Sequence, residues 1–368
     1  MPIGFLEKIE EIPDHRLAGM VSYPLDEILP TTLVGVLRGA DDFEAIELLS
    51  REYLAWLRQF LPYKAGIPRA QTFRKVFRLL KPEVLERCLA AWVASLQDIA
   101  RGVVAVDGKT PCGSNKAADG SGALHLLSAY ACEAGLVIGP RAVNGESNEI
   151  KAIPELLEML ALNGAIVPID AMGTQKAIAG KIVEQEADYV LALKGNQSSL
   201  HEDVKLFFED AELANTCAVH KTASAGHGRI EERECRVADA AGWLQERHKG
   251  WQKLSSIAAI ASTRIAKKTG QTSHETRFYI TSLPADPAAI LAATRAHWGI
   301  ENNLHWQLDI AFDEDRCRTR ADFAPLNLAV VRHIAFNILK RDTSKLFLKR
   351  KRLKASVNPD FRGRLLAC

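Results

Sequence analysis

The chain has 368 residues, of which 47% are hydrophobic and 25% are charged, and its formal net charge is +2. These values are ordinary for a globular protein, and the length suits two or three domains. Its apolar runs are shorter than the roughly 20 residues that span a bilayer, and residues 1–8 lack a signal-peptide pattern. We therefore expect a cytoplasmic protein with no membrane partner. Seven scattered cysteines without CxxC spacing argue against disulfides and structural zinc.

Residues 1–100 are predicted to form a helical domain. Apolar residues recur at three- and four-residue intervals in four segments, which are 25–37, 43–60, 70–80 and 82–99. The stretch 64–81 also carries a set of basic residues: Lys64, Arg69, Arg74, Lys75, Arg78 and Lys81. Such a domain could bind nucleic acid, but a purely structural bundle explains the helical pattern nearly as well.

From residue 101 the pattern changes to alternating strands and helices. The predicted strands are 103–106, 124–132, 136–143, 165–169 and 188–193, and the predicted helices are 149–162, 175–185 and 199–211. Helical crossovers make the later strands parallel to the first. This order predicts an α/β core, a mixed five-stranded sheet with helices on both faces, as in ribonuclease-H-like domains.

This core is predicted in two parts. The first part is 101–214, and a β-rich insertion at 215–283 separates it from the second part at 284–340. The second part contains a long helix from about residue 288 to residue 312. Residues 341–368 are rich in Lys and Arg and form a predicted basic tail, which suits a phosphate backbone but could equally be a solvated segment.

Three acidic residues are the candidate catalytic and metal-binding groups. Asp107 follows the apolar run 103–106, Asp170 follows the run 165–169, and Glu301 lies in the long predicted helix. Ligands of open α/β sheets gather at the carboxyl ends of the strands, so the two aspartates are expected at one sheet edge. Three such carboxylates can hold two Mg²⁺ ions for phosphodiester chemistry.

Each of these acids also has a structural interpretation. Asp107 could be a turn residue, Asp170 a helix cap and Glu301 a solvated helix position. Asp309 and Asp313 compete with Glu301 for the third place. The joint arrangement is what favours the catalytic interpretation.

Candidate DNA contacts lie near the predicted strand ends, in a turn of the insertion and on or after the long helix. They are Lys109, Lys194, Asn196, Gln197, Arg229, Arg295, Arg316 and Arg318. Arg229 follows His227 in a turn that could clamp DNA. For Lys194, Asn196 and Gln197 a plain surface turn is an equal alternative.

Four motifs resemble those of DDE transposases from bacterial insertion sequences. They are Val-Asp-Gly-Lys-Thr at 106–110, Ile-Asp-Ala-Met-Gly-Thr-Gln-Lys at 169–176, the run 188–197, and His-Trp-Gly-Ile-Glu-Asn at 297–302. The closest group is the H-repeat-associated, Rhs-linked family, and the resemblance runs from about residue 25 to residue 340.

This resemblance implies a ribonuclease-H-like core behind an N-terminal helical domain, with Asp107, Asp170 and Glu301 as the acids. It implies two Mg²⁺ or Mn²⁺ ions as cofactors and double-stranded DNA, both the element's terminal repeats and the target, as partner. DNA strand cleavage would be followed by strand transfer. Two ends must be held together, which favours a homodimer.

The chain departs from the wider superfamily around the glutamate. Where that superfamily has Tyr, Arg and Lys, this chain has Thr294, His297 and Leu308, and Arg295 is displaced from the Arg position. Two alternatives therefore stay open. One is a stand-alone magnesium-dependent DNA nuclease, and the other is a DNA-binding remnant that has lost catalysis.

Overall fold

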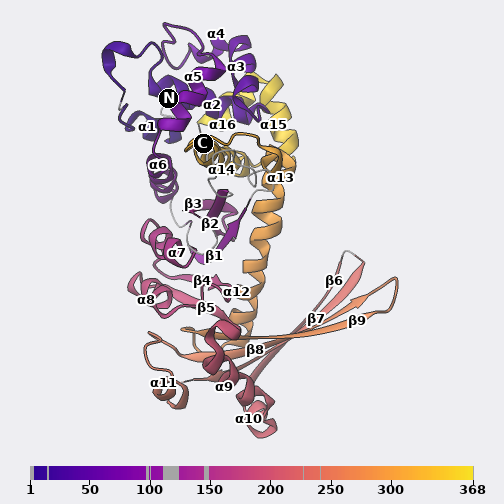
Figure 1. Cartoon of the computed structure of the whole chain (residues 1–368). Helices are drawn as coiled ribbons and strands as arrows, with labels where there is room; N and C mark the ends of the chain where they lie inside the picture. The colour runs from indigo at the N-terminus through magenta and orange to yellow at the C-terminus, as the bar shows by residue number, and fades with distance from the viewer. Residues whose placement is uncertain are drawn as a thin grey trace. The chain divides into compact units, whose positions relative to one another are not determined.

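The computed structural model describes residues 4–14, 16–96, 99, 101–110, 124–144, 149–226, 228–240 and 242–367, so the candidate His227 lies outside the described residues. The chain divides into two compact units. The first unit comprises Met1–Ile99, Gly108–Ala152 and Glu301–Cys368. The second comprises Ala100–Asp107 and Ile153–Ile300. Both contain strands and helices, which confirms the mixed α/β class (Figure 1). The five-segment domain division stays a prediction.

The N-terminal part of the first unit is helical, as predicted. Its helices are α1 (Gly4–Glu10), η1 (Ala18–Met20), α2 (Leu25–Leu37), α3 (Phe43–Glu52), α4 (Leu54–Leu57), α5 (Ala70–Leu79) and α6 (Pro82–Ala94). The predicted helix 43–60 is interrupted at Tyr53, which ends α3. Asp42 caps α3 by accepting a hydrogen bond from the Ala45 amide at 2.8 Å.

The first unit also holds a hairpin and the C-terminal helices. The predicted hairpin is present as β2 (Leu124–Ala131) and β3 (Leu136–Asn144), which are antiparallel. The later elements are the π-helical turn η5 (Glu301–His305), α13 (Trp306–Phe312), η6 (Glu314–Arg316), α14 (Ala324–Arg341), α15 (Leu348–Val357) and α16 (Pro359–Leu366).

Helix α14 is the core of the first unit, because every residue from Leu326 to Leu339 is buried. It contacts α2, α5, α6 and β3. Two asparagine side chains on α14 form hydrogen bonds with backbone groups of other elements. The Asn337 side chain accepts from the Val137 amide at 2.9 Å and donates to the Val137 carbonyl at 2.7 Å. The Asn327 amide donates to the carbonyls of Phe77 and Leu80 at the end of α5. These bonds satisfy polar groups that burial would otherwise leave unpaired.

The basic segment after residue 340 folds into helices and supplies buried cations. Arg352 on α15 is 6% exposed. Its guanidinium donates to the carbonyls of Val36, Ala40 and Ala311 and to the Asp41 carboxylate. One side chain therefore joins α15 to the end of α2 and the end of α13.

The second unit is built on a mixed sheet. Its strands are the start of β1 (Gly102–Lys109), β4 (Ala165–Ile169), β5 (Asp188–Leu193), β6 (Ala218–Gly226), β7 (Arg229–Asp239), β8 (Ser256–Ala266) and β9 (Thr272–Thr281). Its helices are the rest of α7 (Glu149–Glu158), α8 (Lys176–Glu184), η4 (Gly195–Gln197), α9 (Ser198–Glu209), α10 (Ala211–Asn215), α11 (Trp243–Arg247) and α12 (Pro287–Ile300).

The prediction of a five-stranded sheet is wrong, because the sheet has nine strands in the order β3-β2-β1-β4-β5-β9-β8-β7-β6. The β-rich region does not stand apart from the core strands. Its last strand, β9, pairs antiparallel with β5, from Val190 opposite Thr281 to Leu193 opposite Phe278. This pairing satisfies the backbone groups of β5 that an edge strand would leave open.

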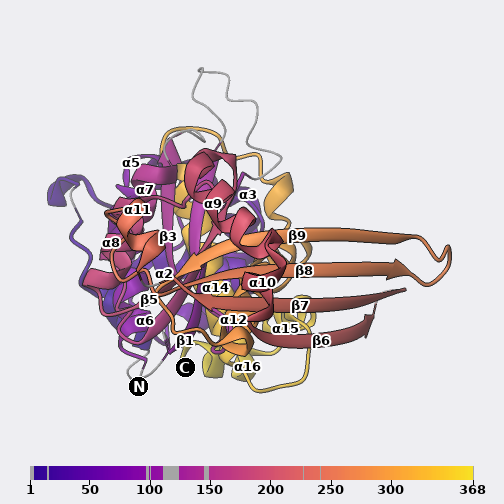
Figure 2. The same cartoon turned by 90° about the horizontal axis from the view of Figure 1, so that it is seen from below.

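Strands β6–β9 form an antiparallel array that extends beyond α9 and α10 of the same unit (Figure 2). Charged side chains pair along it, both within β7 and between β7 and β8. Glu231 lies 2.9 Å from Arg229 and 3.4 Å from Arg264, and it also contacts Arg233. Within the part of the chain that the structure describes, no helix has the length and apolar character needed to cross a membrane.

Replacing Arg352 by Ala should strongly destabilise the protein. Three backbone carbonyls and the Asp41 carboxylate would lose a buried partner, at a cost of about 3 kcal/mol in unfolding free energy. Urea denaturation measures this change. The exposed neighbour Arg350 is the matched control, and Arg350→Ala should change stability little. Equal stability of the two variants would contradict the structural role of Arg352.

The buried His333 on α14 should make the protein less stable in acid. Burial, assisted by His305, Lys109 and Arg332, lowers its pKa to about 3. The unfolded chain takes up this proton near pH 6.5, so unfolding becomes easier as pH falls below that value, by roughly 1–2 kcal/mol at pH 5.

The test compares the slope of unfolding free energy against pH in the wild type and in His333→Gln. Between roughly pH 6.5 and pH 4.5 the variant should have the shallower slope, because it lacks this titrating group. The slope separates this effect from a general loss of stability. Identical slopes would show that His333 does not titrate as inferred.

Candidate active site

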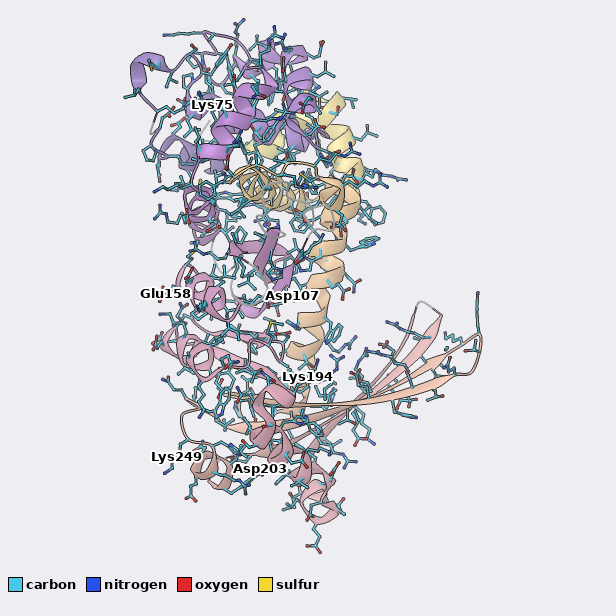
Figure 3. The ribbon with its side chains drawn as sticks, in the orientation of Figure 1. Lys75, Asp107, Glu158, Lys194, Asp203 and Lys249 are labelled. Carbon is cyan, nitrogen blue, oxygen red and sulfur yellow. The ribbon has the colours of Figure 1, made fainter. Side chains whose placement is uncertain are left out.

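Asp107 and Asp170 lie on neighbouring parallel strands of the second unit. Gly102 of β1 pairs with Ala165 of β4, and Val103 pairs with Ile166. Continuing this register to the carboxyl ends brings Asp107 level with Asp170, and neighbouring strands are about 4.8 Å apart. Asp107 is half-buried and Asp170 is exposed. The sequence patterns 103–106 and 165–169 therefore bring Asp107, which is labelled in Figure 3, and Asp170 to one edge of the sheet.

The backbone after Asp170 is held in a tight turn. Asp170 Oδ1 accepts a hydrogen bond from the Gly173 amide at 3.2 Å. The Thr174 hydroxyl donates to the Asp170 carbonyl at 3.2 Å and is also 2.6 Å from the Ala192 carbonyl of β5. A side chain at Gly173 would overlap Ile169 and come within 3.0 Å of Ile153. Glycine at this position is thus a packing requirement of the turn that carries Asp170.

Asn196 and Gln197 support the same turn from the neighbouring strand. The Asn196 amide donates to the Ala171 carbonyl, and the Gln197 amide donates to the Thr174 carbonyl at 2.9 Å. Both residues belong to η4, which follows β5. Their interactions tie the end of β5 to the end of β4. A direct DNA contact by either side chain stays a prediction.

His297 on α12 lies close enough to the two aspartates for their charges to affect its pKa, and the prediction from sequence did not include it as a site residue. Burial lowers its pKa, while the charges of Asp107 and Asp170 oppose that shift and Arg277 reinforces it. The imidazole is therefore mainly neutral near pH 7. Its Nδ1 is buried without a hydrogen-bond partner. A signal did exist in the sequence, because His297 occupies the place of the Arg that the resembled superfamily carries.

Basic groups surround this region on β9 and after β5. The Arg277 guanidinium lies over the ring of Trp298 on α12, 4.5 Å from its centre, and its Nε is 2.8 Å from Glu275. The pKa of Glu275 is lowered, mainly by the hydrogen bond from Arg277, and Lys194 contributes to this shift. Lys194 is exposed after β5 (Figure 3). Its role as a DNA contact stays a prediction.

Glu301 is exposed and is the first residue of η5, directly after α12. Single π-helical turns occur frequently at functional sites. The competing acids have other partners. Asp309 pairs with Lys109, and Asp313 lies 3.7 Å from Arg316 and ends α13 in a left-handed conformation. Among the described acids from residue 301 to residue 316, Glu301 is thus the one without an ion pair.

Lys109 is held among carboxylates of the first unit. Its ammonium contacts Asp309 and lies 3.5 Å from both Glu314 and Asp315. Burial opposes its charge, but these three carboxylates outweigh burial and raise the pKa of Lys109. The side chain is only 14% exposed. Its predicted contact with DNA remains a prediction, and its observed partners are acids of its own unit.

The other predicted DNA contacts lie on exposed surfaces. Arg229 begins β7 and pairs with Glu231, and Arg295 lies exposed on α12. Arg316 ends η6, and Arg318 follows it. Both side chains border a groove of the first unit. Their binding to DNA stays a prediction.

The carboxylates of Asp107 and Asp170 suit a hard divalent cation, which prefers oxygen ligands. The unpartnered Nδ1 of His297 beside them is a further polar group that burial has not satisfied. No group of three or more His, Cys, Asp or Glu residues placed to hold a metal occurs among the described residues. The two aspartates therefore fit part of a metal site.

Comparison with known proteins identifies the class to which this arrangement belongs. Residues 100–338 match the family model described as "Transposase DDE domain", and residues 6–93 match the model "DDE_Tnp_1-associated". The chain belongs to the DDE transposase family and is a DNA transposase. Members of this family generally use divalent metal ions. The family assignment confirms the resemblance that the sequence motifs predict.

Individual relatives match over nearly the whole chain. YncI of Escherichia coli O157:H7, whose name contains the word transposase, is 36% identical over 99% of this chain and 94% of its own. YhhI of Escherichia coli strain K12, whose name adds an association with the H repeat, is 35% identical over 98% of this chain and 97% of the YhhI chain. YbfL of strain K12 is 36% identical over 98% of this chain and 97% of the YbfL chain.

Replacing Gly173 by Ala should disturb the turn that carries Asp170. The added methyl group would force Ile169 or the turn itself to move, and such overpacking costs about 1–3 kcal/mol. Gly195→Ala is the matched control, because a methyl group there meets nothing within 4 Å. Only Gly173→Ala should lower both the stability measured by denaturation and the rate of DNA cleavage. Normal values for Gly173→Ala would contradict the packing argument.

Proposed function

We propose that this transposase cuts the ends of a mobile element and joins the freed strands to target DNA with Asp107, Asp170 and Glu301 as its catalytic acids. The observation that carries this proposal is the β1–β4 register, which brings two of the acids level at the carboxyl ends of parallel strands. In cleavage, a water oxygen bonds to the scissile phosphorus and the bond to the 3′-oxygen breaks. In joining, that 3′-hydroxyl attacks a phosphorus of the target strand, and the bond from this phosphorus to the target's own 3′-oxygen breaks, which leaves a 3′-hydroxyl on the target.

The three carboxylates would hold two divalent ions, Mg²⁺ or Mn²⁺. Such ions activate the attacking oxygen and stabilise the leaving oxygen in an in-line displacement. The chain itself supplies the positions of the carboxylates. The turn at Gly173 and the hydroxyl of Thr174 hold Asp170, and Asp107 lies within strand β1. Glu301, on the helical segment that continues α12, would complete the set.

His297 would orient the carboxylates without competing for them as a cation. Its lowered pKa keeps the imidazole neutral near pH 7, so it can donate one hydrogen bond to an aspartate or a phosphate oxygen. An arginine there would bring a permanent positive charge. His297 in place of the superfamily's arginine therefore removes a positive charge beside the acids and keeps a hydrogen-bond donor there.

The remaining parts of the proposal follow from the proposed reaction. The core strands would form a ribonuclease-H-like catalytic domain, behind an N-terminal helical domain that binds DNA. The partner is double-stranded DNA, at the element's terminal repeats and at the target. Since two ends must be held together, the active form would be a homodimer. The reaction would take place in the cytoplasm, at the nucleoid.

Replacing any one of the acids by its amide, in Asp107→Asn, Asp170→Asn or Glu301→Gln, should abolish strand cleavage. Removing one electrostatic partner of a transition state commonly costs about 10²–10³-fold in rate. Folding and DNA binding should persist, because the amides keep the size of the side chains. Glu202→Gln, at an exposed position of α9, is the matched control. Cleavage at the wild-type rate by any acid variant would remove that residue from the proposal.

An assay with donor and target DNA in one tube separates this function from that of a stand-alone nuclease. With Mg²⁺ present, products that covalently join the two DNAs should accumulate after cleaved donor ends appear. The joined strands are resolved by size on a denaturing gel. Donor cleavage without joining, under conditions where both DNAs are bound, would favour the nuclease.

A further inference from the structure

A groove of the first unit brings together two basic segments that are far apart in sequence. Its volume is about 890 Å³, and its walls come from the start of α3, the exposed side of α5 and the loop from Asp313 to Ala321. Six basic side chains border it: Arg74, Lys75, Arg78, Arg316, Arg318 and Arg320. The proposed catalytic acids are not among the residues that border it.

The acids of this groove have local partners. Asp41 pairs with the buried Arg352 at 3.0 Å, and the Asp42 carboxylate caps α3. Glu44 pairs with Arg74, and Asp313 lies 3.7 Å from Arg316. Every carboxylate that borders the groove is therefore already engaged within the first unit.

Within the part of the chain that the structure describes, three of the basic side chains that border the groove have no carboxylate partner. Lys75 and Arg318 are exposed, and Figure 3 marks Lys75 on α5. Among the described residues, Arg320 donates to the carbonyls of Cys317 and Thr319, at 2.6 and 2.8 Å, and to no carboxylate, so its charge is oriented but not neutralised. The groove consequently keeps an excess of positive charge.

The N-terminal end of α14 adds to this positive potential. Its first residue, Ala324, borders the groove, and Phe323 at the N-cap position provides no side-chain cap. The end of an 18-residue helix carries a partial positive charge. Helix ends of this kind, together with Arg and Lys side chains, suit the phosphate groups of nucleic acid.

We infer that this groove binds the sugar–phosphate backbone of duplex DNA through Lys75, Arg318 and Arg320. The inference rests on the proposed function for its choice of DNA as the anion. It assigns to α5 and to the loop after α13 a shared binding surface, whose bordering residues do not include the proposed acids. Phosphate contacts of this kind position the duplex and read no base sequence.

Salt dependence of binding tests the inference. The probe is a fluorescent duplex of arbitrary sequence, and anisotropy is measured with the full chain over a series of KCl concentrations. The double variant Lys75→Gln, Arg318→Gln should bind more weakly. The slope of log affinity against log salt should become shallower by about 2, because each lost phosphate contact contributes about 0.9.

Two further variants make this outcome interpretable. Lys81→Gln with Arg87→Gln removes the same charge from exposed positions of the same unit that do not border the groove, and it should keep the wild-type slope. Lys75→Arg with Arg318→Lys keeps both cations and should also keep it. Urea denaturation verifies that all variants are folded.

An unchanged slope in the glutamine variant of the groove would overturn the inference, as would an equal change in the Lys81 and Arg87 control. Either result leaves the proposed function standing if metal-dependent cleavage is intact. Conversely, a wild-type chain that binds DNA with the expected salt dependence and yet cleaves no DNA would refute the proposed function. That result would leave the inference about the groove standing.

Discussion

The parallel pairing of β1 with β4 is the constraint on which the rest of the site depends. Strands cannot slip by one residue without turning their side chains to the opposite face, so the buried runs before Asp107 and Asp170 determine which residues end level. Both runs therefore end in a carboxylate at the same edge of the sheet, and the proposed divalent ions would be held by these two acids.

The surroundings of these acids restrict their movement and their charge. Thr174 and the amides of η4 connect the ends of β4 and β5, so the backbone of Asp170 is held from two strands. His297 adds a donor that is mainly neutral near pH 7. By contrast, Lys109 and Arg352 form ion pairs with acids of the first unit, Asp309 and Asp41. Basic residues of this chain thus divide into those that stabilise its units and those that stay open to an anion.

The sequence predicts the local elements well, because apolar periodicity reports which face each element buries. Helix α2 and the hairpin β2–β3 are confirmed nearly residue for residue. The pairing of β9 with β5 was not predictable, because local sequence patterns do not tell which distant strand pairs with the open edge of β5. The position of His297 beside the aspartates required the packing of α12. The groove was equally hidden, because Lys75 and Arg318 meet only when the helices of the first unit are assembled.

The most direct test of this account is a crystal structure of the full chain with Mn²⁺ and DNA, using the anomalous signal of the metal. The account predicts two peaks about 3.5–4 Å apart, ligated by oxygens of Asp107, Asp170 and Glu301. Peaks that engage the aspartates while Glu301 points elsewhere, or the absence of metal at Asp107 and Asp170, would contradict it.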